Sequence, residues 1–297
     1  MPVLKLYPNG GTAGCAPRHK PHESAPRSTV GGWSPSSIRR NTAFLYSVDS
    51  RLLTGHGYAA TLTTRLCPPT SAEWHAIRRS LVEWLRRRGL VRLHWVIEWQ
   101  RRGVPHFHIA FWLPEPMSGD FLVEFLHYWR KLTAHLESEI GSQHVTPIHD
   151  AAGWFQYVSK HAARGLGHYQ RSPENVPPEW QGKTGRMWGK VGDWPSQDAI
   201  RLDVSHPAYY RYRRLVRSWR VADARKALRH AKTPQDRRQA RRRLSSARSM
   251  LSCSDRKLSA VRGVSEWIDL DTSLLLIDNA IGMGSARQEF DEGNKVT

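Results

Sequence analysis

The chain has 297 residues, 39% of them hydrophobic, and a mean hydropathy of −0.58, which is typical of a soluble protein with one sizeable core and argues against a membrane protein. Its net charge of +19 and isoelectric point of about 10.5 indicate a polyanionic partner such as nucleic acid. Three scattered cysteines exclude a disulfide framework and a Cys-x-x-Cys zinc site, and they fit a reducing, cytoplasmic location.

Residues 1–40 are rich in Gly, Pro and Ser and show little apolar periodicity, so we expect a disordered N-terminal segment. Residues 42–64 predict strands on either side of a turn at Gly55-His56-Gly57. Residues 41–200 as a whole read as one folded domain.

Helices and strands alternate through the rest of this domain. A helix is expected over residues 69–89, capped by Thr70 or Ser71 and ended by Gly89. The further elements are strands at 91–98 and 106–113, a helix at 118–140, a strand at 145–148 and a helix at 150–164. The pattern predicts an α+β fold, in which a central antiparallel sheet is flanked by helices.

Two histidines stand out in the strand at 106–113. His106 and His108 are two residues apart, so both imidazoles point to the same face of the sheet. Glu98 lies on the preceding strand across a Gly-Val-Pro turn, and the three side chains together predict a divalent metal site. Gln100 and His94 are substitutes for Glu98 as third ligand. The plain alternative is a pair of strand histidines that only pack.

The helix at 150–164 carries a second pair. Tyr157 and Lys160 are one helical turn apart and share a face. They suit a tyrosine nucleophile assisted by a lysine, although an amphipathic helix with a solvated lysine has the same pattern.

Further along, Gly182-Lys183-Thr184 resembles the end of a P-loop, but Pro177 occupies the position of the required first glycine. We therefore expect no nucleotide site.

The C-terminal third is charged very unevenly. Residues 211–262 hold 18 Lys or Arg and three Asp, whereas residues 263–297 hold two basic and seven acidic residues. Residues 205–262 predict a DNA-binding extension of two basic helices, the second starting at Thr233-Pro234, and residues 263–297 predict an acidic tail. A solvated helical hairpin is the alternative for the basic extension.

Several blocks resemble the HUH endonucleases, and within them the single-tyrosine replication initiators of rolling-circle plasmids and phages. Residues 58–64 (YAATLTT), 105–108 (PHFH) and 157–161 (YVSKH) match the three blocks in order, and residues 185–189 (GRMWG) resemble a downstream segment. The resemblance covers roughly residues 38–195.

The resemblance implies a site-specific enzyme that nicks and rejoins single-stranded DNA at a replication origin, through a 5′-phosphotyrosine intermediate. Tyr157 would be the nucleophile with Lys160 beside it, and His106, His108 and Glu98 would hold Mn²⁺ or Mg²⁺. The implied partners are single-stranded DNA, origin duplex DNA, and a host helicase and DNA polymerase in a bacterial cytoplasm.

Three other functions remain open. An HUH transposase or a mobilisation relaxase would use the same chemistry, although in relaxases the tyrosine precedes the histidines. A non-catalytic DNA-binding regulator would bind DNA through its basic residues but would not cleave it. A second tyrosine, as in two-tyrosine initiators, is not expected because Tyr169 lies beyond Gly165, where the helix should end.

Overall fold

The computed structural model describes residues 1–15, 31–163, 170–252 and 264–293, with side chains left out at a few further positions. Its contacts divide the chain into two compact units. We call residues 23–196 the central unit, and residues 1–22 together with 197–297 the terminal unit. Among the described residues, no helix combines the length and apolar character needed to cross a membrane.

The central unit is built on a five-stranded sheet with the order β6-β3-β5-β4-β7, in which every neighbouring pair is antiparallel. This confirms the predicted α+β class with a central antiparallel sheet. The strands are β3 (His56–Thr63), β4 (Arg92–Trp99), β5 (Pro105–Leu113), β6 (His144–Pro147) and β7 (Trp188–Gly192).

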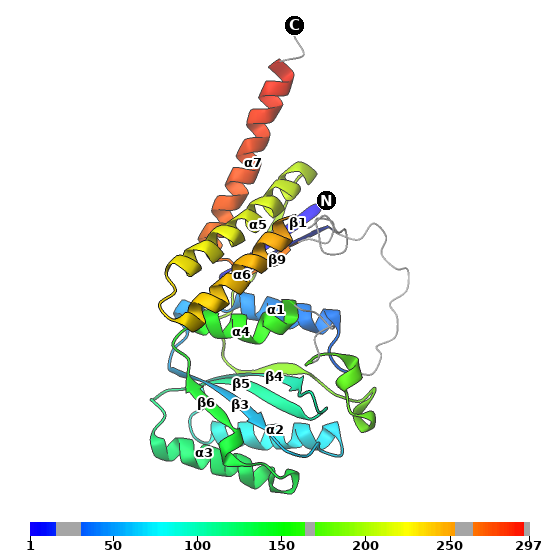
Figure 1. Cartoon of the computed structure of the whole chain (residues 1–297), viewed down its shortest axis with the longest axis vertical. Helices are drawn as coiled ribbons and strands as arrows, with labels where there is room; N and C mark the ends of the chain where they lie inside the picture. The colour runs from blue at the N-terminus through cyan, green and yellow to red at the C-terminus, as the bar shows by residue number, and fades with distance from the viewer. Residues whose placement is uncertain (16–30, 164–169, 253–263, 294–297) are drawn as a thin grey trace. The chain divides into compact units, whose positions relative to one another are not determined.

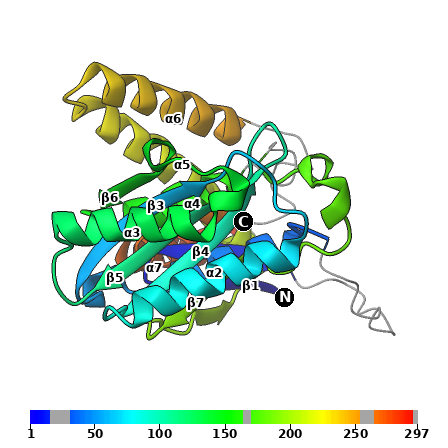
Figure 2. The same ribbon diagram turned by 90° about the horizontal axis from the view of Figure 1, so that it is seen from below.

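Helices cover both faces of this sheet, with α2 and α3 on one side and α1 and α4 on the other (Figure 1). From below, α2 and α3 lie across the strands (Figure 2). The four helices are α1 (Pro35–Ser47), α2 (Ser71–Arg86), α3 (Gly119–Leu132) and α4 (Ala151–Ala163).

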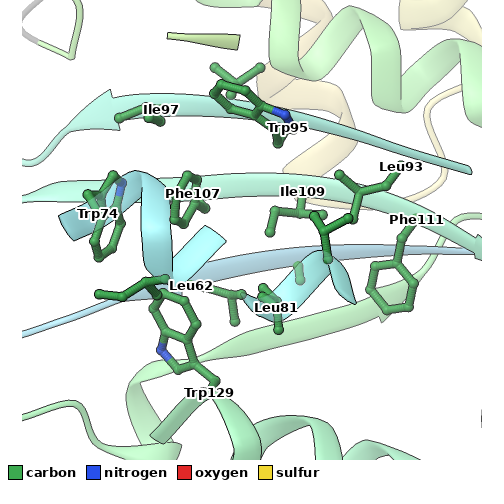
Figure 3. Packing of buried hydrophobic residues seen from close by; sticks show 14 of the residues in the cluster. Leu62, Trp74, Leu81, Leu93, Trp95, Ile97, Phe107, Ile109, Phe111 and Trp129 are labelled. Atoms are coloured by element: carbon green, nitrogen blue, oxygen red, sulfur yellow. The ribbon is translucent and has the colours of Figure 1, made fainter. Parts of the chain in front are cut away.

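The main core fills the layer between the sheet and α2 and α3 (Figure 3). Phe107 of β5 stacks on Trp74 of α2 with ring centroids 4.5 Å apart, and Trp129 of α3 meets Trp74 edge-on. Because strand side chains alternate between faces, Phe107 and Ile109 enter this core while their neighbours His106 and His108 point to the opposite face. The core therefore determines which face receives the histidines.

The helix starts and ends follow the expected chemistry in α2. Thr70 caps α2 by accepting a hydrogen bond from the Glu73 amide, and Gly89 follows its end with a φ of +85°, a value that glycine adopts without strain. The helix predicted over 118–140 is shorter, because α3 ends at Leu132 and 3-10 turns η2 (Ala134–Leu136) and η3 (Ile140–Ser142) follow.

Two N-terminal expectations are wrong. Residues 42–47 do not form a strand; they belong to α1, which Ser34 caps and Pro35 starts. The segment before residue 40 is also ordered where it is described, since β1 (Pro2–Tyr7) and β2 (Gly10–Cys15) pair with each other along their whole length. Residues 16–30 lie outside the described part.

The terminal unit contains a second antiparallel sheet, of order β8-β1-β2-β9, which is completed by β8 (Ile200–Asp203) and β9 (Val264–Glu266). Its helices are α5 (His206–Arg229), α6 (Pro234–Ser252) and α7 (Leu270–Gly293). Leu4 and Leu6 pack with Tyr209 and Tyr212 of α5 and with Ile277 of α7.

The structure bears out the predicted pair of basic C-terminal helices, α5 and α6. The segment expected as an acidic tail is more than a tail, because it supplies β9 and the buried face of α7 to the terminal unit. The apolar run that begins at Leu274 includes Ile277, which is buried in this second core.

A buried histidine makes the stability of the central unit depend on pH. The Nε2 atom of His94 lies 2.8 Å from the Asn41 Oδ1 atom on α1, and burial, with a smaller contribution from the charge of Arg171, lowers the His94 pKa to about 3. His94 is therefore neutral in the folded protein. Between its ordinary pKa of about 6.5 and the folded value, only the unfolded chain binds the proton, so the free energy of unfolding decreases as the pH falls through that window.

Between pH 6 and pH 4, the free energy of unfolding of the variant His94→Gln should fall less steeply with decreasing pH than that of the wild-type protein. The expected difference in slope is about 1 kcal/mol per pH unit, because the variant lacks the titrating ring. Urea unfolding at a series of pH values measures the slope. The matched control is His127→Gln, which removes an exposed histidine of α3 and should leave the slope unchanged. Identical slopes for His94→Gln and the wild-type protein would contradict the assignment.

Candidate metal and DNA-processing site

The β4–β5 hairpin sets the geometry of the site. Its turn is closed by hydrogen bonds from the Gln100 amide to the Val104 carbonyl (2.9 Å) and from the Gly103 amide to the Gln100 carbonyl (3.0 Å). Gly103 has a φ of +76°, which favours glycine. This turn fixes the register that places Glu98 directly opposite His106.

Glu98, His106 and His108 meet on the face of the sheet that α1 and α4 cover. Directly opposed residues of antiparallel strands share a face, so Glu98 beside His106 and His108 two residues on form one cluster. All three side chains are buried. The Nε2 atoms of the two histidines are 3.0 Å apart, and Glu98 Oε2 is 3.3 Å from His108 Nε2.

The donor set fits a divalent cation. One ligand atom from each of the three residues lies within 4.8 Å of the others. Adjacent ligands of an octahedral ion with bonds of about 2.1 Å are separated by about 3.0 Å, which matches the separation of the two imidazole nitrogens. Imidazole and carboxylate together suit first-row ions, with three protein ligands leaving positions open.

The other candidates for the third ligand have different partners. The Gln100 side-chain amide donates to Thr63 Oγ1, and His94 pairs with Asn41. Thr61, which faces His108 across β3 and β5, places its Oγ1 atom 3.1 Å from His108 Nδ1. Thr61 therefore orients the ring whose other nitrogen faces Glu98 and His106.

Arg171 joins the trio to α4. Its Nε and Nη2 atoms donate to Glu98 Oε1 at 3.1 and 2.9 Å, and Nη2 also donates to the Val158 carbonyl of α4 at 3.0 Å. The guanidinium lies 4.1 Å from the centre of the Trp33 ring and is almost wholly buried. Burial lowers the Arg171 pKa, whereas the negative charge of Glu98 raises it and favours the charged pair.

Helix α4 packs over the same face as the trio. Phe155 of α4 is fully buried and lies 6.4 Å, centroid to centroid, from Trp112 of β5. The backbone at positions 157 and 160 belongs to α4, but the side chains of Tyr157 and Lys160 lie outside the described part of the structure. Their roles remain predictions.

A cavity of about 410 Å³ lies between α4 and the β3–β6 edge of the sheet. Thr61, which contacts His108, is part of its wall, as are Trp154 and Gly153 on α4 and His144 on β6. Residue 157 follows Gly153 by about one helical turn. The cavity wall thus includes both the threonine that contacts His108 and residues of the helix that carries Tyr157.

Relatives of the chain were identified by sequence. A model of the family described as replication-associated protein ORF2/G2P matches residues 57–164. The "Replication-associated protein G2P" of Pseudomonas phage Pf3 is 47% identical over 270 residues, which covers 90% of this chain and 93% of the phage protein. A "Putative replication protein" of Xylella fastidiosa (strain 9a5c) is 47% identical over 290 residues, covering 96% of this chain and 98% of the relative.

The chain belongs to the ORF2/G2P family of replication-associated proteins. The predicted resemblance to phage and plasmid replication initiators is thereby confirmed. The part matched by the family model begins in β3 and ends after α4, so it includes Glu98, His106 and His108 and positions 157 and 160. No solved structure matches the chain.

Other sequence features of this ORF2/G2P protein have structural roles. Trp99 and Trp112 are buried and pack in the interior of the central unit. The P-loop-like stretch packs on α2, with the Thr184 carbonyl 3.0 Å from His75 Nε2 and the Lys183 carbonyl accepting from Ser71. The GRMWG segment leads into β7, and the Met187 carbonyl accepts from the Ile97 amide of β4.

Arg171 is the site residue that sequence reasoning missed. It lies 73 positions after Glu98, outside all the matched blocks, in a stretch with no periodic pattern. One indirect signal was available. A carboxylate such as Glu98, if buried, requires a positively charged partner, but the sequence does not say which residue supplies it.

We expect Arg171→Lys to weaken Mn²⁺ binding by about 10- to 100-fold, since a lysine keeps the charge but cannot hold Glu98 Oε1 and the Val158 carbonyl as a fork. Isothermal titration calorimetry with Mn²⁺ measures the affinity. Arg130→Lys, an exposed change on α3, is the control and should bind Mn²⁺ like the wild-type protein. Equal Mn²⁺ affinity for the two variants would show that Arg171 does not contribute to metal binding.

Proposed function

We propose that this replication protein is a metal-dependent tyrosine endonuclease and ligase, which nicks one DNA strand at the replication origin and later rejoins it. The observation that carries the proposal is the buried trio of Glu98, His106 and His108 on the sheet face covered by α4, the helix of Tyr157. Membership of the replication-associated family supports a role in DNA replication, and the trio supports metal-dependent strand cleavage.

The residues divide the work of the proposed reaction. A divalent ion, Mn²⁺ or Mg²⁺, would supply a positive charge that polarises the scissile phosphate. Glu98, His106 and His108 would hold this ion, Thr61 orients His108, and Arg171 holds Glu98 in place through two hydrogen bonds. The apolar layer beneath the trio excludes water from one side of the site.

Tyr157 is the proposed nucleophile. Its phenol has an ordinary pKa of about 10, so the proton must leave before attack at neutral pH. The phenolate oxygen forms a bond to phosphorus, the bond from phosphorus to the 3′ oxygen breaks, and the 3′ oxygen takes up a proton. The products are a 5′-phosphotyrosine and a free 3′-hydroxyl that primes a host polymerase. Reversal of the same steps rejoins the strand without an external energy source.

Lys160 has two alternative roles in this proposal. Its ammonium group either stabilises the phenolate of Tyr157 or donates the proton to the departing 3′ oxygen. Strand separation would depend on a host helicase, because Pro177 stands where a P-loop needs its first glycine. An HUH transposase or relaxase would share the chemistry, and a DNA-binding regulator would lack it.

The covalent step is tested with full-length protein and single-stranded DNA tiled across its own replicon, in the presence of Mn²⁺. We expect a protein–DNA adduct on a denaturing gel for the wild-type protein and none for Tyr157→Phe, which lacks the attacking oxygen. Tyr169→Phe is the matched control and should form the adduct normally. DNA binding without an adduct in any divalent ion would support the regulator instead.

Removal of the metal gives a separate expectation. EDTA should abolish the adduct, and Mn²⁺ should raise the melting temperature of the wild-type protein but not that of His106→Asn/His108→Asn, because only ligand bound to the folded state stabilises it. Differential scanning fluorimetry measures the shift, with His127→Asn as the control. A Mn²⁺ shift that survives in the double variant would place the ion elsewhere.

A further inference from the structure

Helix α6 is attached to the terminal unit by a narrow apolar seam. Leu244 and Ala247 are buried against Val221 and Ala224 of α5, and Ala240, one turn before Leu244, is buried as well. All other residues from 234 to 249 are exposed. Most of the circumference of α6 is therefore surface, although the helix is well anchored along one side.

The exposed surface of α6 is strongly basic. It carries six arginines, Arg237, Arg238, Arg241, Arg242, Arg243 and Arg248. Arg243 forms an ion pair with Asp223 of α5 at 3.0 Å. The single acidic residue of α6, Asp236, takes part in the capping box with Thr233 at the start of the helix.

Helical periodicity places Arg238 and Arg242 on the side opposite the buried seam, with Arg241 on the flank. Ser245 and Ser249 continue the outward row towards the C-terminal end. We call Arg238, Arg241 and Arg242 the arginine ridge.

We propose that the arginine ridge is a docking surface for the sugar-phosphate backbone of duplex DNA. Guanidinium groups bind phosphates with paired hydrogen bonds, and hydroxyls on the same row add further donors. The helix contains no aromatic residue, and Tyr209 and Tyr212 of α5 are buried in the second core. The exposed Tyr210 lies near the start of α5, at the opposite end from the turn that leads into α6. Surfaces for single strands combine charge with aromatic stacking platforms, which this ridge lacks, so the duplex is the favoured partner.

The proposal assigns a second DNA contact to a different folded unit. The metal trio belongs to the central unit, and the ridge belongs to the terminal unit. Duplex binding at the ridge requires neither the metal nor Tyr157, so its failure and the failure of the nicking proposal are separable. A replication protein with such a surface remains on the origin duplex independently of the cleaved strand.

The test compares the full-length protein with the triple variant Arg238→Gln/Arg241→Gln/Arg242→Gln. Fluorescence anisotropy measures binding to a labelled duplex of about 30 base pairs and to oligo(dT) of equal length, over a series of salt concentrations. We expect duplex affinity to fall at least about tenfold, and the slope of log affinity against log salt to decrease by about 0.9 for each lost phosphate contact. Binding to oligo(dT) and adduct formation on single-stranded DNA should stay within about twofold.

Two controls separate the ridge from bulk charge and from misfolding. Arg87→Gln/Arg130→Gln/Lys131→Gln removes the same charge from exposed positions of the central unit and should retain duplex affinity. The charge-preserving variant Arg238→Lys/Arg241→Lys/Arg242→Lys should retain most of it as well. Equal losses in the two glutamine variants, an unchanged duplex affinity in the ridge variant, or an equal loss for oligo(dT) would overturn the proposal.

Discussion

The register between β4 and β5 is the constraint on which the site depends. Side chains alternate along a strand, so a slip of one residue would move His106 and His108 from the α4 face into the aromatic core and would expel Phe107. The Gly103 turn and the stacking of Phe107 on Trp74 both oppose that slip. The large apolar residues on one face thus position His106 and His108, the proposed metal ligands, on the other.

A second dependence runs through the charge of Glu98. A carboxylate held away from water is costly unless a partner compensates it, and breaking a buried pair by removing one partner typically costs about 3–5 kcal/mol. Arg171 supplies that compensation and at the same time holds a carbonyl of α4. Sheet, connecting segment and helix are therefore tied together at the point where the chemistry is proposed, which limits how far α4 can move from the trio.

Local patterns predicted strands β3 to β6 of the central sheet because their signals are short-range, whereas β7 was not predicted. The cap at Thr70, the alternation through β5 and the two-residue spacing of the histidines lie within single elements. What could not be predicted depends on distant partners. Arg171 has no motif, and β1 looked unstructured because the strand that completes its pairing on the other side, β8, comes almost 200 residues later. Helix α1 was misread because its start signals, Ser34 and Pro35, fell in a segment assigned to disorder.

The second sheet joins the two ends of the chain, with β1 and β2 hydrogen-bonded to β8 and β9. During synthesis, β1 can pair with β2 early, but its second partner, β8, is made only with residues 200–203. All strands of the central sheet have been made by residue 192. The unit bearing the metal trio can therefore fold on the ribosome before the unit bearing α6 is complete. A chain truncated by premature termination would keep the former and lose the latter, and even a short deletion at the N-terminus would act on a sheet completed nearly 200 residues away.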